Sequence, residues 1–269
     1  MKTLKEHTVD MPFMIAIAKE AGQLQMRYFQ KLKQQQIKKK SYKDYVTIVD
    51  QLSEQLIIKR IRSQYPNHEI LAEESGGKQL RHTRGPIWVI DPLDGTTNFI
   101  HGIPIFSVSI AFFNKGKVFS GVVYDPARNE AFYAQRQKGA YLNGKRIHVS
   151  RCNNVESALL ATGIPFRKID ILEPYIRIFR KLCMAASGIR RCGSAALDLV
   201  YTASGRYDGF WEFGLNVWDI AAGSIIVKEA GGKISDFDAK QQHLLSGNII
   251  CGNPVIYKKL LQCIRDARV

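Results

Sequence analysis

The sequence predicts a mixed α+β and α/β fold built in two subdomains, residues 1–150 and 151–269. Amphipathic helices and hairpin-linked strands make up the first half, whereas short strands alternate with helices after residue 150. Strands joined by tight turns pair antiparallel, and strands joined through helices favour parallel pairing. We therefore expect a mostly antiparallel sheet in the first half and an α/β unit in the second.

Helical periodicity places the first helix over residues 11–33, and the second is expected over residues 50–65. The polar and strongly basic segment 34–43 between them is expected to be a mobile surface loop. A short strand follows at 69–72. In the second half, the pattern predicts strands at 159–162, 207–211 and 249–250, and helices at 175–186, 195–205, 218–232 and from residue 253.

Strands dominate residues 107–149, where alternating segments are separated by turn sequences. The segment GAYLNGK at 139–145 resembles the start of a phosphate-binding P-loop, but Arg146 stands where that motif needs Ser or Thr for magnesium. Asn143-Gly144 is also a strong type I′ hairpin turn. We interpret the segment as a turn.

The stretch WVIDPLDGTTNFIH at 88–101 carries the strongest chemical signal. It begins with residues typical of a buried strand. Asp91 and Asp94 then lie three positions apart at the end of that strand, and they would repel each other unless a positive charge lay between them. A hard divalent cation satisfies this requirement, and the Leu93 carbonyl is available as a further oxygen ligand.

Gly95 and Thr96 follow at the start of what the pattern predicts to be a short helix. Free N–H groups at a helix start suit a phosphate group. A metal ion beside a phosphate indicates phosphoryl chemistry. The alternative interpretation is an acidic N-cap turn, as in many βα loops, which would not need both carboxylates.

Further acidic residues stand at predicted strand ends and helix starts. Glu73 and Glu74 end a strand, and because neighbouring residues on a strand point to opposite faces, only one of them should face a site. Asp50 and Asp219 each open a helix, so N-capping alone would account for both. Glu212 ends another strand.

These motifs resemble those of a known family. The run at 88–101, together with WDIAAGSIIVKEAGG at 218–232, is similar to the two signatures of the inositol monophosphatase family. The resemblance covers about residues 10–265 and is strongest to the bacterial extragenic-suppressor-type inositol-1-monophosphatases. It implies a layered α-β-α-β-α sandwich of the inositol monophosphatase and fructose-1,6-bisphosphatase type, with the site between the halves. It also implies Mg²⁺, two or three ions per site, and a homodimer.

The resemblance implies a role for each of the acidic residues and their neighbours. Five residues would supply oxygen ligands to the metal ions: Glu73, Asp91, Leu93 through its carbonyl, Asp94 and Asp219. Substrate contacts would come from Gly95, Thr96, Gly193, Ser194, Ala195, Glu212 and Asp219. Catalysis would depend on Thr96, Asp50 and Glu73, with Asp50 paired to the Thr96 hydroxyl and helping to activate the attacking water. From the sequence itself, Gly193 would equally serve a plain strand-to-helix turn.

Three other positions keep more than one interpretation. The resemblance places a lysine of segment 34–43 near the second metal ion. Lys39 fits by its spacing to Asp50, and Lys40 fits nearly as well. The alternative is that these lysines are simply solvated surface charges. Glu74 would support the metal ligands or be structural. Arg191 is a candidate phosphate, dimer or partner contact, again with solvated charge as the alternative.

Composition excludes several classes of protein. The 269 residues are 45% hydrophobic and 23% charged, and no apolar run approaches the ~20 residues that span a bilayer. The N-terminal residues lack the apolar region of a signal peptide, so we expect a cytoplasmic protein without a membrane partner. Five scattered cysteines without C-x-x-C spacing are typical of reduced thiols.

The chain is strongly basic, with 39 Lys and Arg against 24 Asp and Glu and a net charge of +15. Such a charge can steer small anionic phosphate esters toward a site. It can also indicate contact with RNA or the transcription machinery. Charge alone does not separate these two interpretations.

The sequence therefore predicts a Mg²⁺-dependent phosphomonoesterase that hydrolyses myo-inositol monophosphate to inositol and phosphate by direct attack of metal-activated water. Phosphatases with an aspartyl nucleophile need Asp-x-Asp, whereas the acids here are spaced D-P-L-D. Cysteine phosphatases need Cys and Arg separated by five residues, and Cys183 and Arg190 are one residue too far apart. One alternative is a sister phosphatase acting on fructose-1,6-bisphosphate, 3′-phosphoadenosine 5′-phosphate or histidinol phosphate. The other is a regulatory protein that binds RNA or a transcription complex.

Overall fold

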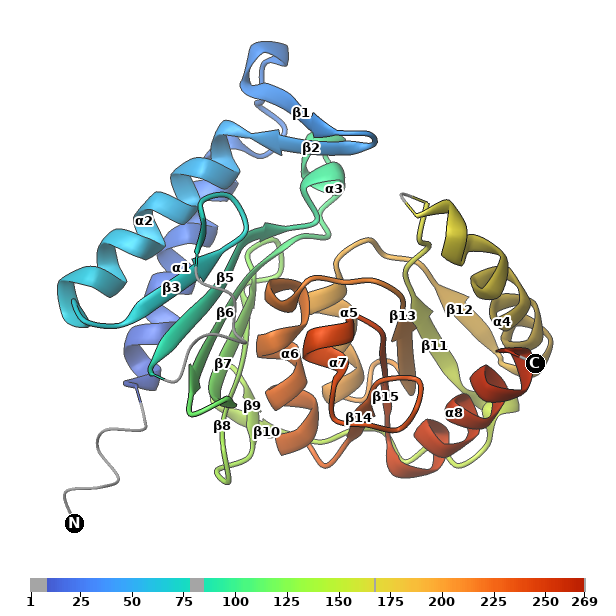
Figure 1. Cartoon of the computed structure of the whole chain (residues 1–269). Helices are drawn as coiled ribbons and strands as arrows, with labels where there is room; N and C mark the ends of the chain where they lie inside the picture. Colours follow the sequence, from blue (N-terminus) through green and yellow to red (C-terminus); the bar gives the residue numbers. More distant parts are fainter. Residues whose placement is uncertain (1–8, 78–84, 167, 269) are drawn as a thin grey trace.

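The computed structural model describes residues 9–77, 85–166 and 168–268, which form five layers in the order α-β-α-β-α. Figure 1 shows helices on the outer face of the first sheet, between the two sheets, and on the outer face of the second sheet. The layered sandwich that the family resemblance implies is therefore confirmed. In the described part of the chain, no helix is long and apolar enough to cross a membrane.

The first sheet is mostly antiparallel, as the hairpin pattern predicts. Its strands, given in their order across the sheet, are β10 (Lys145–Ile147), β9 (Ala140–Leu142), β8 (Glu130–Gln135), β7 (Lys117–Asp125), β6 (Ser107–Asn114), β5 (Ile87–Asp94), β3 (Glu69–Ala72) and β4 (Gly76–Gly77). Among the described residues, β3 and β5 are its parallel pair. The segment 139–145 forms the β9–β10 hairpin, with positive φ at Asn143 and Gly144, so its interpretation as a turn is confirmed.

Two helices, α1 (Met11–Tyr28) and α2 (Ile48–Gln64), cover the outer face of the first sheet. The first is shorter than the predicted 11–33. It ends because the backbone turns extended at Phe29, whose ring packs against Phe99 and Phe106 at centroid distances of 5.6 and 5.1 Å. Tertiary packing of an aromatic ring thus overrides helix propensity at this end.

The segment predicted as a mobile loop is instead structured, and that prediction was wrong. It holds a 3₁₀ turn, Gln34–Gln36, and then β1 (Ile37–Ser41), which pairs antiparallel with β2 (Asp44–Thr47). The lysines of β1 lie on a two-stranded ribbon, where charged side chains are common on exposed strand edges, although the Lys40 side chain also pairs with nearby acidic groups. The polar composition that suggested a loop is therefore equally compatible with this hairpin.

The second helix begins two residues earlier than predicted. Thr47 is its N-cap and accepts a hydrogen bond from the Val49 amide, while the Asp50 carboxylate accepts one from the Thr47 amide at 2.8 Å. This reciprocal arrangement is a capping box. Asp50 therefore stands one turn inside the helix, and its second carboxylate oxygen remains available for another contact.

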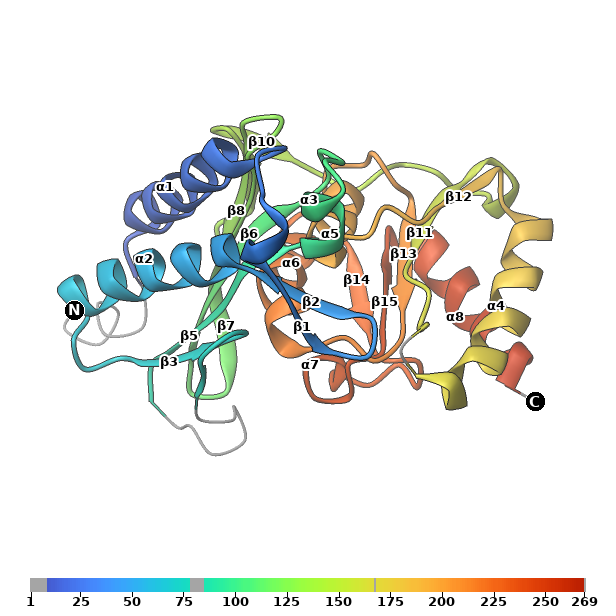
Figure 2. The ribbon, with the colours of Figure 1, turned by 90° about the horizontal axis from the view of Figure 1, so that it is seen from above.

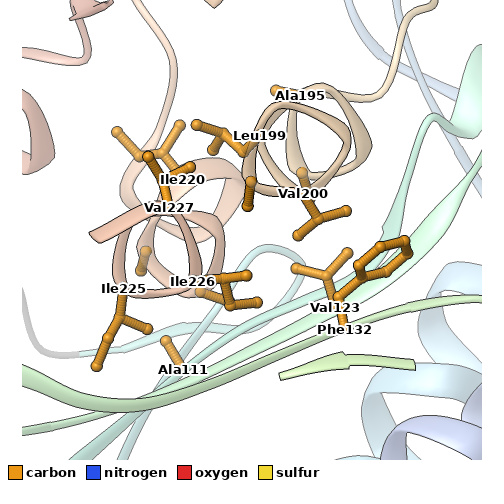
Figure 3. Packing of buried hydrophobic residues seen from close by; sticks show 14 of the residues in the cluster. Ala111, Val123, Phe132, Ala195, Leu199, Val200, Ile220, Ile225, Ile226 and Val227 are labelled. Atoms are coloured by element: carbon orange, nitrogen blue, oxygen red, sulfur yellow. The ribbon is translucent and has the colours of Figure 1, made fainter. Parts of the chain in front are cut away.

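The middle layer consists of α5 (Ala195–Ala203) and α6 (Val217–Glu229), which both sheets share. Figure 3 shows Val200 of α5 beside Val123 and Phe132 of the first sheet. These three side chains are almost fully buried and belong to the largest apolar cluster. Because this cluster combines residues from both halves of the chain, the two halves are held together by one core.

The second sheet is mixed. In order across it, its strands are β12 (Gly188–Arg190), β11 (Leu159–Thr162), β13 (Gly209–Glu212), β15 (Ile249–Gly252) and β14 (Lys233–Ser235). The first three are parallel, and β15 runs antiparallel to both of its neighbours. Its outer face is covered by α4 (Leu172–Ala185) and α8 (Pro254–Arg268). Among the described residues, the remaining short elements are α3 (Thr96–Ile100), two 3₁₀ turns (Val155–Ser157 and Ile169–Ile171) and α7 (His243–Ser246).

A glycine on β7 allows the middle layer to approach the first sheet. A Cβ at Gly121 would lie 2.8 Å from the Ala222 carbonyl oxygen and 2.9 Å from its Cα. Gly121→Ala is therefore expected to destabilise the protein by about 1–3 kcal/mol through overpacking against a backbone that cannot yield locally. Urea denaturation measures this change in the free energy of unfolding.

Gly85→Ala is the matched control for this substitution, since a Cβ at Gly85 meets nothing within 4 Å. The control should unfold at the same urea concentration as the wild-type protein. Equal stability of the Gly121 and Gly85 variants would contradict the close approach of α6 to β7.

Candidate active site

A cavity of about 450 Å³ collects most of the residues that the sequence predicts for a site. Its lining includes residues of β2 and α3, two elements that Figure 2 shows from above. The predicted residues that line it are Glu73, Asp91, Leu93, Asp94, Gly95, Thr96, Arg191, Gly193, Ser194, Ala195, Glu212 and Asp219. Asp50 reaches the cavity through Thr96. Glu74 and Lys39 are not among its lining residues.

The end of β5 carries the two aspartates predicted to repel each other. The ladder between β5 and β6 is interrupted between Asp91 and Asp94, so the chain bulges there and presents both carboxylates to the cavity. The Asp91 carboxylate accepts the Leu93 amide at 3.0 Å. The buried Gln25 side chain of α1 donates a hydrogen bond to the Pro92 carbonyl at 2.6 Å, and this bond ties the bulge to the outer helix.

Asp94 connects the two halves of the chain. Its Oδ2 accepts hydrogen bonds from the Ser194 hydroxyl at 2.6 Å and the Ala196 amide at 2.8 Å, both at the start of α5. A carboxylate is stabilised at a helix start by the N–H groups that lack helical partners. The next residue, Gly95, has φ +101, and a Cβ there would lie 2.9 Å from the Ile105 carbonyl oxygen, so glycine is required at this turn.

Thr96 and Asp50 form a hydrogen-bonded pair beside the cavity. The Thr96 hydroxyl donates to Asp50 Oδ1 at 2.9 Å, and its oxygen lies 3.1 Å from the Leu93 carbonyl oxygen. This is the pairing that the family resemblance implies. Burial raises the pKa of the Asp50 carboxyl to about 6, although hydrogen bonds from Thr47 and Thr96 oppose that rise.

Lys40, and not Lys39, reaches the acidic cluster. Its Nζ lies 3.3 Å from the Glu73 carboxylate and also pairs with the Glu74 carboxylate. The β1–β2 ladder is irregular between Lys39 and Ser41, so Lys40 lies where the strand pairing is interrupted. Spacing to Asp50 could not reveal this, since the assignment depends on the register of a hairpin that the sequence did not predict.

Four carboxyl groups at the cavity share an unfavourable electrostatic environment. Burial raises the pKa of Glu73, Asp91, Asp94 and Asp219, in the case of Asp94 to about 6. For Asp91, the negative charges of the other three raise it further. Burial favours the neutral form, and like charges nearby have the same effect. A cation in the cavity would reverse this penalty.

The donor set fits Mg²⁺. Within residues 9–77, 85–166 and 168–268, no three His, Cys, Asp or Glu side chains form a closed metal-binding group. Mg²⁺ does not need such a group, because it is usually held by one or two carboxylates together with waters and substrate phosphate oxygens. Glu73, Asp91, Asp94 and Asp219 all line the same cavity as Leu93, so hard oxygen donors are present in sufficient number.

The second half of the chain supplies the other wall of the cavity. Burial raises the pKa of Glu212 to about 8, and the Arg191 charge opposes this rise. A Cβ at Gly163 would lie 1.8 Å from Glu212 Oε1, so glycine at this position leaves the space that the carboxyl group occupies. Ser194 caps α5 by accepting the Leu197 amide and also donates to Asp94, so the turn at Gly193 serves both helix capping and the site.

Sequence reasoning missed several lining residues. Asp198 lies on the cavity wall, fully buried, and its Oδ1 has no hydrogen-bond partner. Asn98 donates to the carbonyls of Ile105 and Cys192, both at 2.8 Å, and so ties the two halves together. Phe166 lies beneath the guanidinium of Arg191, 5.5 Å from its ring centroid. An aspartate in the otherwise apolar helix AALDLVY was the one signal that could have indicated Asp198.

Comparison with known proteins decides the family. The family model described as "Inositol monophosphatase family" matches residues 8–268. The chain belongs to the inositol monophosphatase family. It is 49% identical over 255 residues to a protein of Pseudomonas aeruginosa named "Nus factor SuhB", an alignment that covers 92% of this chain and 93% of that protein.

Solved structures of this family share the fold. The crystal structure of the extragenic suppressor protein suhB from Bartonella henselae has a TM-score of 0.90 at 39% identity, over 95% of this chain and 98% of that one. The IMPase of Thermotoga maritima has a TM-score of 0.87 at 36% identity, over 96% and 97%. These likenesses support phosphatase activity for this inositol monophosphatase family member, and the family generally uses Mg²⁺.

Glu212→Gln is expected to flatten the pH dependence of stability in the Mg²⁺-free protein. Folding raises the pKa of Glu212 from 4.5 to about 8, so the native state binds more protons than the unfolded state in this window. The free energy of unfolding therefore falls as the pH rises through the window, and glutamine removes this contribution. Urea denaturation between about pH 5 and about pH 9 measures the difference.

Glu20→Gln, at an exposed ion pair with Arg60 on the outer helices, is the control and should follow the wild-type protein. A Glu212 variant whose stability falls as steeply as that of the wild type would show that Glu212 does not carry a raised pKa.

Proposed function

We propose that this member of the inositol monophosphatase family is a Mg²⁺-dependent phosphomonoesterase that hydrolyses myo-inositol monophosphate to inositol and phosphate. The observation that supports this most is the meeting of four carboxyl groups, each with a raised pKa, with the Asp50–Thr96 pair at one cavity. That combination brings candidate metal ligands and a proton acceptor to the same cavity. A purely structural turn needs neither.

Substrate binding would use both walls of the cavity. We propose that the amides of Gly95 and Thr96, at the start of α3, hold phosphate oxygens as charge redistributes during the reaction. Glu212, at the end of β13, also lines the cavity. With its pKa raised to about 8, it would be protonated near neutral pH and could both donate to and accept from ring hydroxyls of inositol.

Activation of water would depend on Thr96 and Asp50. Because the Thr96 hydroxyl donates to Asp50, its lone pairs are available to accept a proton from a water molecule in the cavity. Thr96 would then pass its own proton to the Asp50 carboxylate. The pKa of Asp50, raised to about 6 by burial, makes it a better proton acceptor than an ordinary aspartate while leaving it ionised at neutral pH.

Mg²⁺, when held by Glu73, Asp91, Asp94, Asp219 and the Leu93 carbonyl, would supply Lewis acidity toward the phosphate and the attacking and leaving oxygens. The protein residues hold these ligands in place before substrate arrives. Asp94 is fixed by the start of α5, and Asp219 accepts the Asn216 amide at 2.7 Å in the capping box of α6.

The alternative to direct attack by water is a cysteine nucleophile, and the surroundings of Cys192 disfavour it. Cys192 lies next to the cavity, but its Sγ contacts the Tyr207 hydroxyl at 3.2 Å. Burial raises the pKa of this thiol, which disfavours the thiolate that a nucleophile requires. No covalent enzyme intermediate is therefore needed in the proposal.

The experiment that tests this proposal is phosphate release from a panel of esters with and without Mg²⁺. The panel holds inositol-1-phosphate, fructose-1,6-bisphosphate, 3′-phosphoadenosine 5′-phosphate and histidinol phosphate. Mg²⁺-dependent preference for inositol-1-phosphate is the expected result. Preference for another ester would assign a sister activity, and turnover of none of them would refute the proposal.

Asp94→Asn is expected to reduce turnover of inositol-1-phosphate by about 100-fold or more, since even partners of metal ligands cost 10–100-fold. Asparagine keeps one oxygen acceptor for the start of α5, so the fold should persist, as circular dichroism would verify. Asp170→Asn, on an exposed 3₁₀ turn, is the control and should retain activity. Near-wild-type turnover by the Asp94 variant would refute the metal assignment.

A second candidate function concerns transcription. Relatives of 44–49% identity bear the name "Nus factor SuhB", and this chain carries a net charge of +15. We propose that the protein also contacts RNA or a transcription complex, acting in the cytoplasm as a homodimer. RNA affinity that falls steeply with salt would support the contact, and sedimentation would test the dimer.

A further inference from the structure

Glu54 is a buried acidic residue beside the candidate site that the sequence analysis did not single out. It lies on α2, one turn beyond Asp50, and its side chain is only 4% exposed. One carboxylate oxygen accepts the Glu74 amide at 2.8 Å and the other accepts the Ser75 amide at 2.9 Å. Both oxygens thus bind backbone, in the turn that joins β3 to β4.

This turn begins at Glu73, the proposed metal ligand. On one side, the amides that follow Glu73 are held by Glu54 of α2. On the other side, Lys40 of the β1–β2 hairpin pairs with the carboxylates of Glu73 and Glu74. The Glu73 amide itself donates to the Ile90 carbonyl at 3.2 Å, which joins the start of the turn to β5. The turn that carries the Glu73 carboxylate is therefore held by contacts to α2, to the β1–β2 hairpin and to β5.

A carboxylate at position 54 is electrostatically unfavourable, because other acidic groups lie nearby. Glu54 adds negative charge to a region that already contains several acids, and it contributes to raising the pKa of Glu74. Glutamine has a similar size but offers only one acceptor oxygen, so it could not present a separate oxygen to each amide, and its NH₂ group would face one of the two N–H donors. Two charge-assisted hydrogen bonds hold the turn more firmly than neutral ones, and the extra negative charge favours a cation nearby.

The same helix face carries a second acid of the site. Asp50 and Glu54 are four residues apart, so they lie on one side of α2. Asp50 binds Thr96 after β5, and Glu54 binds the turn after β3. One rigid helix therefore sets the positions of the proton acceptor and of the Glu73 turn relative to each other.

We propose that Glu54 is a positioning residue, which fixes the Glu73 turn so that the Glu73 carboxylate is preorganised to bind Mg²⁺. This inference rests on the metal site of the proposed function. It does not depend on which phosphate ester is the substrate.

The test compares Glu54→Gln with the wild-type protein by calorimetric titration with Mg²⁺ alone, without substrate. The variant should bind Mg²⁺ about 10–100-fold more weakly, the range measured when partners of metal ligands are removed. The Mg²⁺ concentration for half-maximal turnover of inositol-1-phosphate should rise by the same factor. At saturating Mg²⁺, kcat should return to within about twofold of wild type, because Glu54 does not touch the substrate.

Two further variants control this experiment. Glu20→Gln makes the same chemical change at an exposed ion pair and should leave Mg²⁺ affinity unchanged. Glu54→Asp keeps both oxygens on a shorter side chain and should weaken Mg²⁺ binding less than Glu54→Gln. If Glu54→Gln fails to fold by circular dichroism, the Glu54→Asp variant carries the comparison with wild type.

Unchanged Mg²⁺ affinity in a folded Glu54 variant would overturn the proposal. A loss of kcat that high Mg²⁺ does not restore would also overturn it, since that pattern indicates general structural damage. Absence of Mg²⁺ binding by the wild-type protein would overturn both this inference and the metal site. Intact Mg²⁺ binding without turnover of any ester would refute the proposed function and leave the inference about Glu54 standing.

Discussion

The burial of several like charges in one cavity is the constraint on which the rest of the site depends. Carboxylates removed from water and placed near one another are unstable unless hydrogen bonds or cations compensate them. The protein compensates them largely with backbone amides at helix starts. Asp50 accepts an amide at the start of α2, Asp94 one at the start of α5, and Asp219 one at the start of α6. The arrangement of the helices is therefore inseparable from the arrangement of the acids.

The middle helical layer explains why the site needs both halves of the chain. Helices α5 and α6 belong to the second half, yet they bury their apolar faces against the first sheet. Their first turns consequently point at the bulge that ends β5, where Asp91 and Asp94 lie. Packing of Gly121 against α6 sets this approach, so the geometry of the acidic cluster is coupled to core packing at some distance from it.

The part of the cavity lined by the second half of the chain combines acidic, basic and aromatic groups. Glu212, Asp198 and Arg191 place acidic and basic groups around a space that also contains the ring of Phe166. Such a surface can discriminate between alcohols by their hydroxyl positions, because any buried polar group left without a partner costs free energy. In the proposed function, substrate choice would therefore depend on these residues, whereas the acidic cluster would suit any phosphate monoester.

Alternation and turn residues in the sequence predicted an antiparallel first half, an α/β second half and the β9–β10 turn, because these depend on local patterns. The layered sandwich and the members of the acidic cluster followed from the family resemblance carried by the two motifs at 88–101 and 218–232. The sequence did not determine the β1–β2 hairpin or the contact made by Lys40, since both depend on strand register. Nor did it indicate Glu54, whose partners lie about 20 residues away in the chain. Only tertiary structure brings such residues together, because long-range contacts leave no periodic trace in the sequence.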